Sequence, residues 1–208
     1  MIRFCTEKDK KSIIKIWNDV FKDSPEEIEH FLEFADVGDA PGLFIDGELV
    51  SFLFLLDSYI LIDGQRYSAK YVYAACTVTA YRGRGYMGEL LGFAKRYCSE
   101  NSVDFLTLVP AEDSLFSYYE RFGYKNYFYA CRTDSAVHYE LDGLDYMSFD
   151  EPMLSYARKI TDESYIDNLI PAQFCGGDNE IPVGMALALS ERAKTKNNHK
   201  VFFNLTMG

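Results

Sequence analysis

The sequence predicts an α/β fold of the α+β kind, and three observations indicate it. Apolar residues recur at helical spacing between residues 13 and 35. Residues 42–79 are rich in β-branched and aromatic residues, and two Asp-Gly pairs interrupt them, which is typical of three antiparallel strands. Residues 86–131 then alternate between helical and strand-like stretches. We therefore expect the order β-α-α-β-β-β-α-β-α-β up to residue 131.

The amino-terminal elements begin with clear local signals. Residues 2–5 indicate a short strand, after which Thr6 and Asp9 have a spacing close to that of a capping box. Ser24, followed by Pro25 in the first turn, marks the start of a second helix. The apolar residues expected on the buried faces of the two helices are Ile13, Ile16, Trp17, Val20, Phe21, Ile28, Phe31, Leu32 and Ala35.

The later elements follow from turn residues and from a change of period. The pairs Asp46-Gly47 and Asp63-Gly64 predict the two tight turns of the meander. Gly123 stands where a glycine commonly ends a helix. The elements expected after the meander are helix 86–100, strand 103–109, helix 114–122 and strand 124–131.

The pattern beyond residue 131 is weaker. Asp150 with Pro152 predicts the start of one helix, and Thr161 the start of another. Residues 182–189 and 201–206 indicate two closing strands. No repeat or linker is evident, so we expect the last ~70 residues to pack on the first part, as one compact unit of this length would.

The composition excludes several classes of protein. Of the 208 residues, 48% are hydrophobic and 25% charged, which predicts a folded core. The net charge of −11 argues against sequence-independent binding to nucleic acid, which relies on an excess of Lys and Arg. The apolar runs are far shorter than the ~20 residues of a membrane span, and no signal peptide is evident. We expect a cytoplasmic protein with neither nucleic acid nor membrane as partner.

The cysteines and histidines lack the spacing of ligand sets. Five cysteines occur at positions 5, 76, 98, 131 and 175 without a CxxC pair, which predicts free thiols in a reducing compartment. Three histidines at positions 30, 138 and 199 are far apart in sequence. No metal site is therefore expected.

The segment from Cys76 to Leu91 carries the chemical signal. A strand runs into a turn with glycines at positions 83, 85 and 88, and a helix follows at once. Glycines allow close approach of a ligand, and the first N–H groups of a helix have no partner within it. Together with the helix dipole they form an anion site suited to a pyrophosphate. Arg82 and Arg84 add positive charge in a chain that is otherwise strongly negative.

Two ligand classes fit this turn. Gly83-x-Gly85-x-x-Gly88 matches the dinucleotide fingerprint formally. The acidic residue at about the required separation, Asp104, lies at the start of its strand, where it cannot reach a ribose. The preceding strand also belongs to a meander, so a dinucleotide enzyme is the weaker alternative.

The second ligand class rests on a resemblance. Arg82-Gly-Arg-Gly85 resembles the Arg/Gln-x-x-Gly-x-Gly/Ala phosphate loop of the GNAT superfamily of acyl-CoA-dependent N-acyltransferases, although Met87 replaces the last Gly and Gly88 follows it. This variant resembles a bacterial branch related to the enhanced-intracellular-survival acetyltransferases. Leu115-Phe-Ser-Tyr-Tyr119-Glu-Arg-Phe-Gly-Tyr124 resembles a second segment of the family, and the order of elements agrees.

The resemblance implies a mixed, mostly antiparallel central sheet that is splayed between two parallel strands, with helices on both faces and a C-terminal αβ extension. Residues 1–135 would form the GNAT domain that binds acetyl-CoA and carries catalysis. Residues 136–208 would form the extension, a partial second GNAT-like half, packing on the first or continuous with it.

The resemblance also implies residue roles. Backbone groups of Cys76, Thr77 and Val78 would pair with the pantetheine arm, and the Val78 amide would polarise the thioester carbonyl. Ser114 and Leu115 would flank the pantetheine. The loop residues implied in pyrophosphate binding are Arg82, Gly83, Arg84, Gly85, Tyr86, Met87 and Gly88.

Tyr119 matches the tyrosine that donates a proton to the departing CoA thiolate. An acyl-cysteine at Cys76 is the less favoured alternative to simple packing, because direct transfer needs no nucleophilic side chain. The general base is open between Glu112, Asp113 and a Tyr71/Tyr73 pair. In the survival-type enzymes a terminal carboxylate is implicated, which makes the Gly208 carboxylate a further candidate.

The function expected is acetyl transfer from acetyl-CoA to a primary amine by direct attack. The acceptor would be a small-molecule or peptide amine, and the charge of −11 slightly favours a cationic one. A non-catalytic acyl-CoA sensor or interaction module is the alternative from another class. A homodimer is left open.

Overall fold

The computed structural model describes residues 1–132, 143–160, 169–172, 180–197 and 199–203. By contacts between residues the chain divides into two units, the first Met1–Leu56 with Tyr71–Tyr97, the second Asp57–Lys70 with Cys98–Gly208. The division falls inside two long strands, β3 (Glu48–Ile62) and β4 (Gln65–Thr77). Each unit is described separately below, and the domain limits of 1–135 and 136–208 stay a prediction.

The first unit contains β1 (Ile2–Phe4) and β2 (Pro41–Ile45), with the first part of β3 and the last part of β4. β1 pairs with β2, and β2 with β3, both antiparallel. The helical elements are η1 (Glu7–Asp9), α1 (Lys10–Phe21), α2 (Pro25–Phe31), η2 (Val37–Asp39), η3 (Thr79–Tyr81) and α3 (Tyr86–Glu100), whose last turn belongs to the second unit.

The sequence signals at the starts of these helices act as expected. The Ser24 hydroxyl accepts the Glu27 N–H at 3.2 Å, and the Glu27 carboxylate accepts the Ser24 N–H at 2.7 Å. This reciprocal pair satisfies two N–H groups that the helix itself leaves free. Asp46 and Gly47 have φ of 50° and 86°, the left-handed pair that a tight hairpin turn requires. The predicted capping signal and the first hairpin turn are both confirmed.

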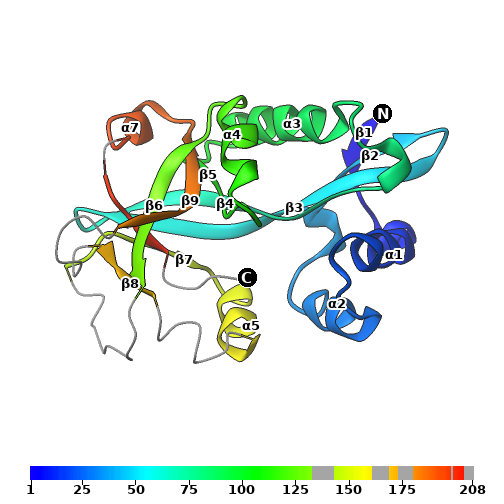
Figure 1. Cartoon of the computed structure of the whole chain (residues 1–208), viewed down its shortest axis with the longest axis horizontal. Helices are drawn as coiled ribbons and strands as arrows, with labels where there is room; N and C mark the ends of the chain where they lie inside the picture. Colours follow the sequence, from blue (N-terminus) through cyan, green and yellow to red (C-terminus); the bar gives the residue numbers. More distant parts are fainter. Residues whose placement is uncertain (133–142, 161–168, 173–179, 198, 204–208) are drawn as a thin grey trace. The chain divides into compact units, whose positions relative to one another are not determined.

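Aromatic side chains fill the core of the first unit. Trp17 of α1 lies 5.0 Å from Phe31 of α2 and 5.9 Å from Phe54 of β3, measured between ring centroids. On β1, Phe4 packs against Phe93 and Tyr97 of α3 at 5.7 and 4.8 Å. Within this unit α1 and α2 cover one face of the strands and α3 the other (Figure 1). Burial of these rings is the main stabilising contribution to the unit.

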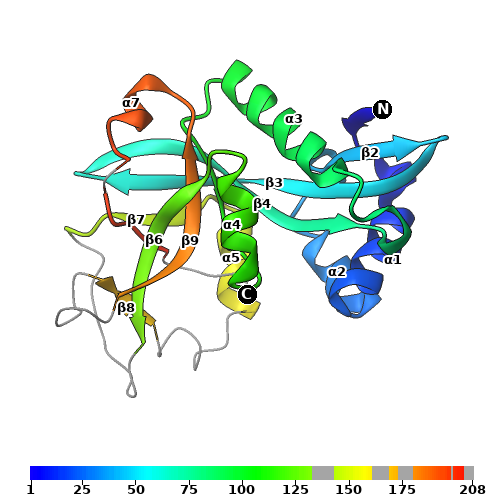
Figure 2. The ribbon, with the colours of Figure 1, turned by 45° about the horizontal axis from the view of Figure 1, so that its top comes forward.

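The second unit contains the strand order β5-β9-β6-β8, with every neighbouring pair antiparallel. Figure 2 shows β6 and β9 side by side. β7 pairs antiparallel with β3 over Ser58–Leu61 and parallel with β10. The bounds are β5 (Phe105–Leu108), β6 (Lys125–Arg132), β7 (Tyr146–Phe149), β8 (Leu169–Pro171), β9 (Ile181–Ala188) and β10 (Phe202–Phe203), with helices α4 (Ser114–Glu120), α5 (Met153–Ile160) and α7 (Glu191–Lys194).

β4 and β5 run in the same direction. The Asp104 N–H donates to the Ser68 carbonyl at 3.1 Å, and the Thr107 hydroxyl donates to the Lys70 carbonyl at 3.4 Å. Both strands therefore advance together along their contact. The fold is a mixed, mostly antiparallel α/β fold with one pair of parallel strands at this position, as the sequence predicts.

The sequence prediction is weaker after residue 131. The first expected helix is present as α5, and the first closing strand as β9. Residues 161–168, where a further helix was expected, and 204–206 of the second closing strand lie outside the described residues. The short elements β7, β8 and α7 were not predicted, because each spans at most four residues and has no readable period.

The cysteines differ in part from the expectation. Cys5, Cys76 and Cys98 are buried free thiols. Cys131 is disulfide-bonded, so the expectation of free thiols throughout is wrong at that position. Among the described helices, none combines the length and the hydropathy that crossing a membrane requires.

Candidate functional site

The turn between β4 and α3 has an open backbone that only glycine adopts easily. Gly83 and Gly85 have φ of +75° and +83°. A Cβ added at either position would meet no atom within 4 Å, so the left-handed backbone and not crowding explains the glycines. The turn is therefore exposed and has room for a ligand along its backbone.

The first amides of α3 have no acceptor within the helix. The first helical bond joins the Glu89 N–H to the Gly85 carbonyl at 3.0 Å. The N–H groups of Tyr86, Met87 and Gly88 precede that bond. They lie at the positive end of a 15-residue helix. The predicted anion site thus has its donors in place.

Two guanidinium groups accompany these amides. Arg82 donates through Nε to the Thr77 carbonyl at 3.2 Å, which folds its side chain back onto the end of β4. Arg84 lies over the ring of Tyr81 at 5.3 Å. Within the described part of the chain, neither has a carboxylate partner. Unpaired cations in a chain with net charge −11 indicate a site for an anionic ligand.

The end of β4 is partly occupied by bonds within the protein. The Cys76 carbonyl accepts the Ser51 hydroxyl at 2.8 Å. The Val78 N–H donates to the Val50 carbonyl at 3.0 Å. This bond leaves the Val78 amide without a free N–H, so its expected role toward the thioester oxygen is not retained. Thr77 offers its carbonyl to Arg82 and its hydroxyl to Ser51.

The Cys76 side chain is inaccessible and unreactive. It is fully buried, and burial raises the pKa of its thiol well above the ordinary range. A nucleophilic cysteine requires the thiolate form, which this environment disfavours. The burial supports packing over an acyl-cysteine intermediate.

Helix α4 of the second unit carries the remaining described candidates. The Ser114 hydroxyl donates to the Glu112 carboxylate at 2.6 Å, and Leu115 is half-buried in the same turn. Tyr119 is 8% exposed and packs edge-on against the rings of Tyr118 and Tyr124 at 5.3 and 5.9 Å. Gly208 lies outside the described residues.

The environment keeps the Tyr119 hydroxyl protonated. Burial, and secondarily the neighbouring Tyr118, raises the pKa of Tyr119 to about 12. At neutral pH the group is therefore a hydrogen-bond donor at all times. A donor of this kind suits a charge that develops on a departing group.

Tyr124 is a neighbour that the sequence motifs did not single out as functional. Its side chain is fully buried, and its hydroxyl has no hydrogen-bond partner among the described residues. Burial and the adjacent Tyr119 raise its pKa. Its place directly after Gly123 could have drawn attention to it. Gly123 follows α4 with a left-handed φ of +92°, and after this turn the ring of Tyr124 packs against Tyr119.

A histidine and two carboxylates gather at the tip of the β3–β4 hairpin. His199 Nδ1 lies 2.9 Å from Asp145, and the ligand atoms of His199, Asp145 and Asp63 lie within 4.8 Å of one another. The spacing of the histidines in sequence did not reveal this group. Lys196 Nζ lies 2.5 Å from Asp63 and supplies the positive charge that a cation would bring. We interpret the group as a network of ion pairs.

The comparisons with known proteins agree with this geometry. A family model described as an acetyltransferase (GNAT) domain matches residues 1–126. YhbS of Escherichia coli, solved in complex with CoA, aligns with a TM-score of 0.58 at 14% identity, covering 98% of this chain and 87% of that one. A GCN5-related N-acetyltransferase of Anabaena variabilis has a TM-score of 0.58 at 20% identity, with 66% and 36% covered. Eis1 of Mycobacterium abscessus has 0.54 at 16%, with 67% and 37% covered.

These likenesses concern the fold, and the expected fold class is confirmed by them. The chain spans 34% to 49% of the length of the first five structures that it matches. No curated protein matches the sequence. The family model, in contrast, covers more than half of the chain, including the glycine turn and Tyr119. On this match the chain belongs to the GNAT family of acetyltransferases.

Proposed function

We propose that the protein transfers an acetyl group from acetyl-CoA to a primary amine. The single observation that carries the proposal is the turn before α3, where unpaired Arg82 and Arg84 accompany helix amides that precede the first helical bond. A pyrophosphate is the anion that such a turn fits. The complex of the E. coli structure with CoA supports acetyl-CoA as the co-substrate.

The proposed step is direct attack. The amine nitrogen forms a bond to the acetyl carbon, the carbon–sulfur bond breaks, and the amine loses a proton. Tyr119 donates a hydrogen bond, and then a proton, to the sulfur as negative charge develops there. Because the pKa of Tyr119 is high, its hydroxyl is protonated at neutral pH. It gives up the proton only when negative charge develops on the sulfur. The acceptor is a small-molecule or peptide amine, and the net charge of −11 slightly favours a cationic one.

A comparison of two neighbouring tyrosines tests this proposal. Tyr119→Phe keeps the ring and removes the hydroxyl, and we expect kcat to fall ~10²-fold with acetyl-CoA affinity unchanged. Tyr118→Phe is the matched control, because its ring packs on Tyr119 from the same helix. Turnover is measured by release of free thiol with a panel of amines. Equal kcat values for the two variants would remove Tyr119 from the mechanism.

The panel also separates the proposal from its alternative. Binding of acetyl-CoA with no amine acetylated, in wild type and variants alike, would favour the non-catalytic acyl-CoA sensor. The sensor would keep the turn before α3 and would be insensitive to Tyr119→Phe.

The base that removes the amine proton is a separate prediction. An alkyl amine has a pKa near ~10.4, so its neutral form costs about 4–5 kcal/mol at pH 7. The candidates for this role are Glu112, Asp113, the Tyr71/Tyr73 pair and the Gly208 carboxylate. If the Gly208 carboxylate is the base, adding a few residues after Gly208 lowers kcat while the Tm stays the same. An unchanged kcat would leave the other three candidates.

A further inference from the structure

A cavity of about 310 Å³ lies in the second unit, and none of the residues assigned above to acetyl-CoA or to catalysis lines it. Its walls come from β3, β4, the end of β7 and α7. Three of its lining residues are cations, in a chain whose net charge is −11. The charged lining residues are Arg66, Lys70, Arg192, Asp57 and Asp150.

The cations of this cavity have donors to spare. Lys70 is 16% exposed, and its Nζ bonds Asp57 at 2.7 Å, which uses one of its three N–H groups. Arg66 contacts Asp150 through Nη2 and lies over the ring of Tyr59 at 3.9 Å. Its Nε and Nη1 take no part in the bond to Asp150.

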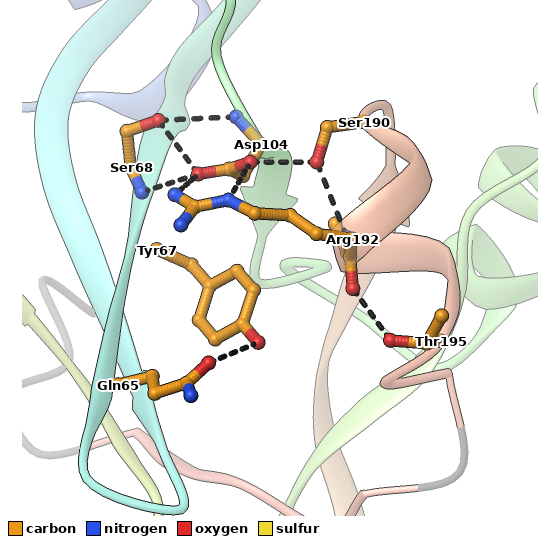
Figure 3. A network of polar contacts seen from close by, with 8 residues as sticks. Gln65, Tyr67, Ser68, Asp104, Ser190, Arg192 and Thr195 are labelled. Carbon is orange, nitrogen blue, oxygen red and sulfur yellow. Dashed lines mark hydrogen bonds and ion pairs between the residues drawn. The ribbon is translucent and has the colours of Figure 1, made fainter.

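Arg192 is held in a fixed orientation at the cavity wall. Its Nε and Nη2 both bond the buried carboxylate of Asp104, the former at 2.8 Å. Figure 3 shows the guanidinium beside the ring of Tyr67, and the distance from its central carbon to the ring centroid is 4.7 Å. Its Nη1 takes no part in the bonds to Asp104. The group is thus positioned by the protein and still has N–H groups to offer.

The carboxylates that pair with Lys70 and Arg66 do not prevent an anion from binding in the cavity. Asp57 is 70% exposed and Asp150 is 42% exposed, and pairs with such exposed carboxylates contribute little to stability. An anion inside the cavity can therefore replace them as the partner of Lys70 and Arg66. Asp104, in contrast, is buried and stays bound to Arg192.

From these contacts we infer that the cavity binds a small organic anion through its carboxylate or phosphate oxygens. The volume exceeds that of an inorganic ion and reaches the lower limit of pockets for organic ligands. The oxygens bond Lys70 and the N–H groups of Arg66 and Arg192 that the bonds to Asp150 and Asp104 leave free. This site is independent of acetyl transfer and stands whether or not the proposed function holds.

Calorimetry on the full chain tests the site with three probes: citrate, glycerol 3-phosphate and inorganic phosphate. We expect either citrate or glycerol 3-phosphate to bind more tightly than inorganic phosphate. Tighter binding of citrate would identify carboxylate as the group that the cavity prefers, and tighter binding of glycerol 3-phosphate would identify phosphate. Lys70→Met keeps the aliphatic stem and is expected to weaken binding at least tenfold. Lys95→Met, an exposed lysine of the first unit, is the matched control for charge and should leave binding unchanged.

A further variant fixes the sign of the effect. Asp57→Asn removes the competing carboxylate and is expected to tighten binding about threefold or more. Tighter binding by Asp57→Asn excludes a cation site, for which the same change would weaken binding.

The inference is overturned if none of the probes binds at millimolar concentration, or if Asp57→Asn weakens binding. Displacement of the bound probe by CoA would also overturn it, because the cavity would then belong to the co-substrate. Unchanged acetyl-CoA affinity in Lys70→Met, with circular dichroism like that of wild type, would support a separate site.

Discussion

At the scale of single residues, the turn before α3 depends on backbone angles more than on side chains. Gly83 and Gly85 hold φ values of +75° and +83° with open space around them. The sequence made this turn predictable, because closely spaced glycines directly before a helix are typical of a loop that binds an anion. The bond from the Val78 amide to Val50 could not be predicted, because it depends on how β3 and β4 pair around that point.

Gly85→Ala tests the backbone requirement. A Cβ in the left-handed region costs about 1–2 kcal/mol, and relief of that strain would move the amides that we propose bind the pyrophosphate. We expect the Kd for acetyl-CoA to rise about tenfold by calorimetry. Gly47→Ala is the matched control, with φ of +86° and equally open surroundings in a turn away from the ligand. The idea fails if both variants bind acetyl-CoA as the wild type does.

At the scale of elements, a buried carboxylate joins three parts of the second unit. Asp104, just before β5, accepts bonds from the Ser68 N–H and hydroxyl on β4 and from Ser190 and Arg192 of the α7 region. Burial alone would raise the pKa of Asp104, but the bonds from Arg192, Ser190 and Ser68 outweigh it and lower the pKa to about 2. From the sequence, Asp104 could be considered only as a ribose ligand and was excluded as one, because its partners in α7 lie far along the chain.

Arg192→Met is expected to reduce the free energy of unfolding by about 2 kcal/mol at pH 7, because the buried carboxylate loses its charged partner. A lowered carboxyl pKa stabilises the folded state above the unfolded value of 3.8, and that stabilisation is lost as the pH falls through about 2. The difference between wild type and variant should therefore be full above pH 4 and shrink toward pH 2. Urea unfolding at several pH values measures it, with Arg96→Met as a control at an exposed arginine. A difference independent of pH would contradict this account.

At the scale of the whole molecule, the longer elements follow from period and caps, and the site residues follow from motifs. The strands and helices up to residue 131 were predictable because each has a clear period or a turn residue at its end. The carboxy-terminal part was harder to predict from the sequence, since its short strands β7 and β8 form by pairing with distant segments. The anion cavity has no motif at all, because Arg66, Lys70 and Arg192 meet only in the folded unit.

Ligand-dependent stability is the prediction at this scale. Acetyl-CoA at about 100 times its Kd should stabilise the chain by about 2.7 kcal/mol, which corresponds to a rise in Tm of about 5–10 °C. NAD and NADH at the same concentrations should produce no rise, since the acidic residue of a dinucleotide site is engaged with Arg192. Thermal denaturation measures both, and a rise with NAD alone would favour the dinucleotide alternative.

The buried thiols have a consequence for the proposed reaction with a thioester. Acyl groups pass readily from one sulfur to another, but only an ionised sulfur accepts them. Burial raises the pKa values of Cys5 and Cys98 to about 12, and that of Cys76 further still. While folded, the protein is therefore protected at these three positions from acylation by the proposed donor.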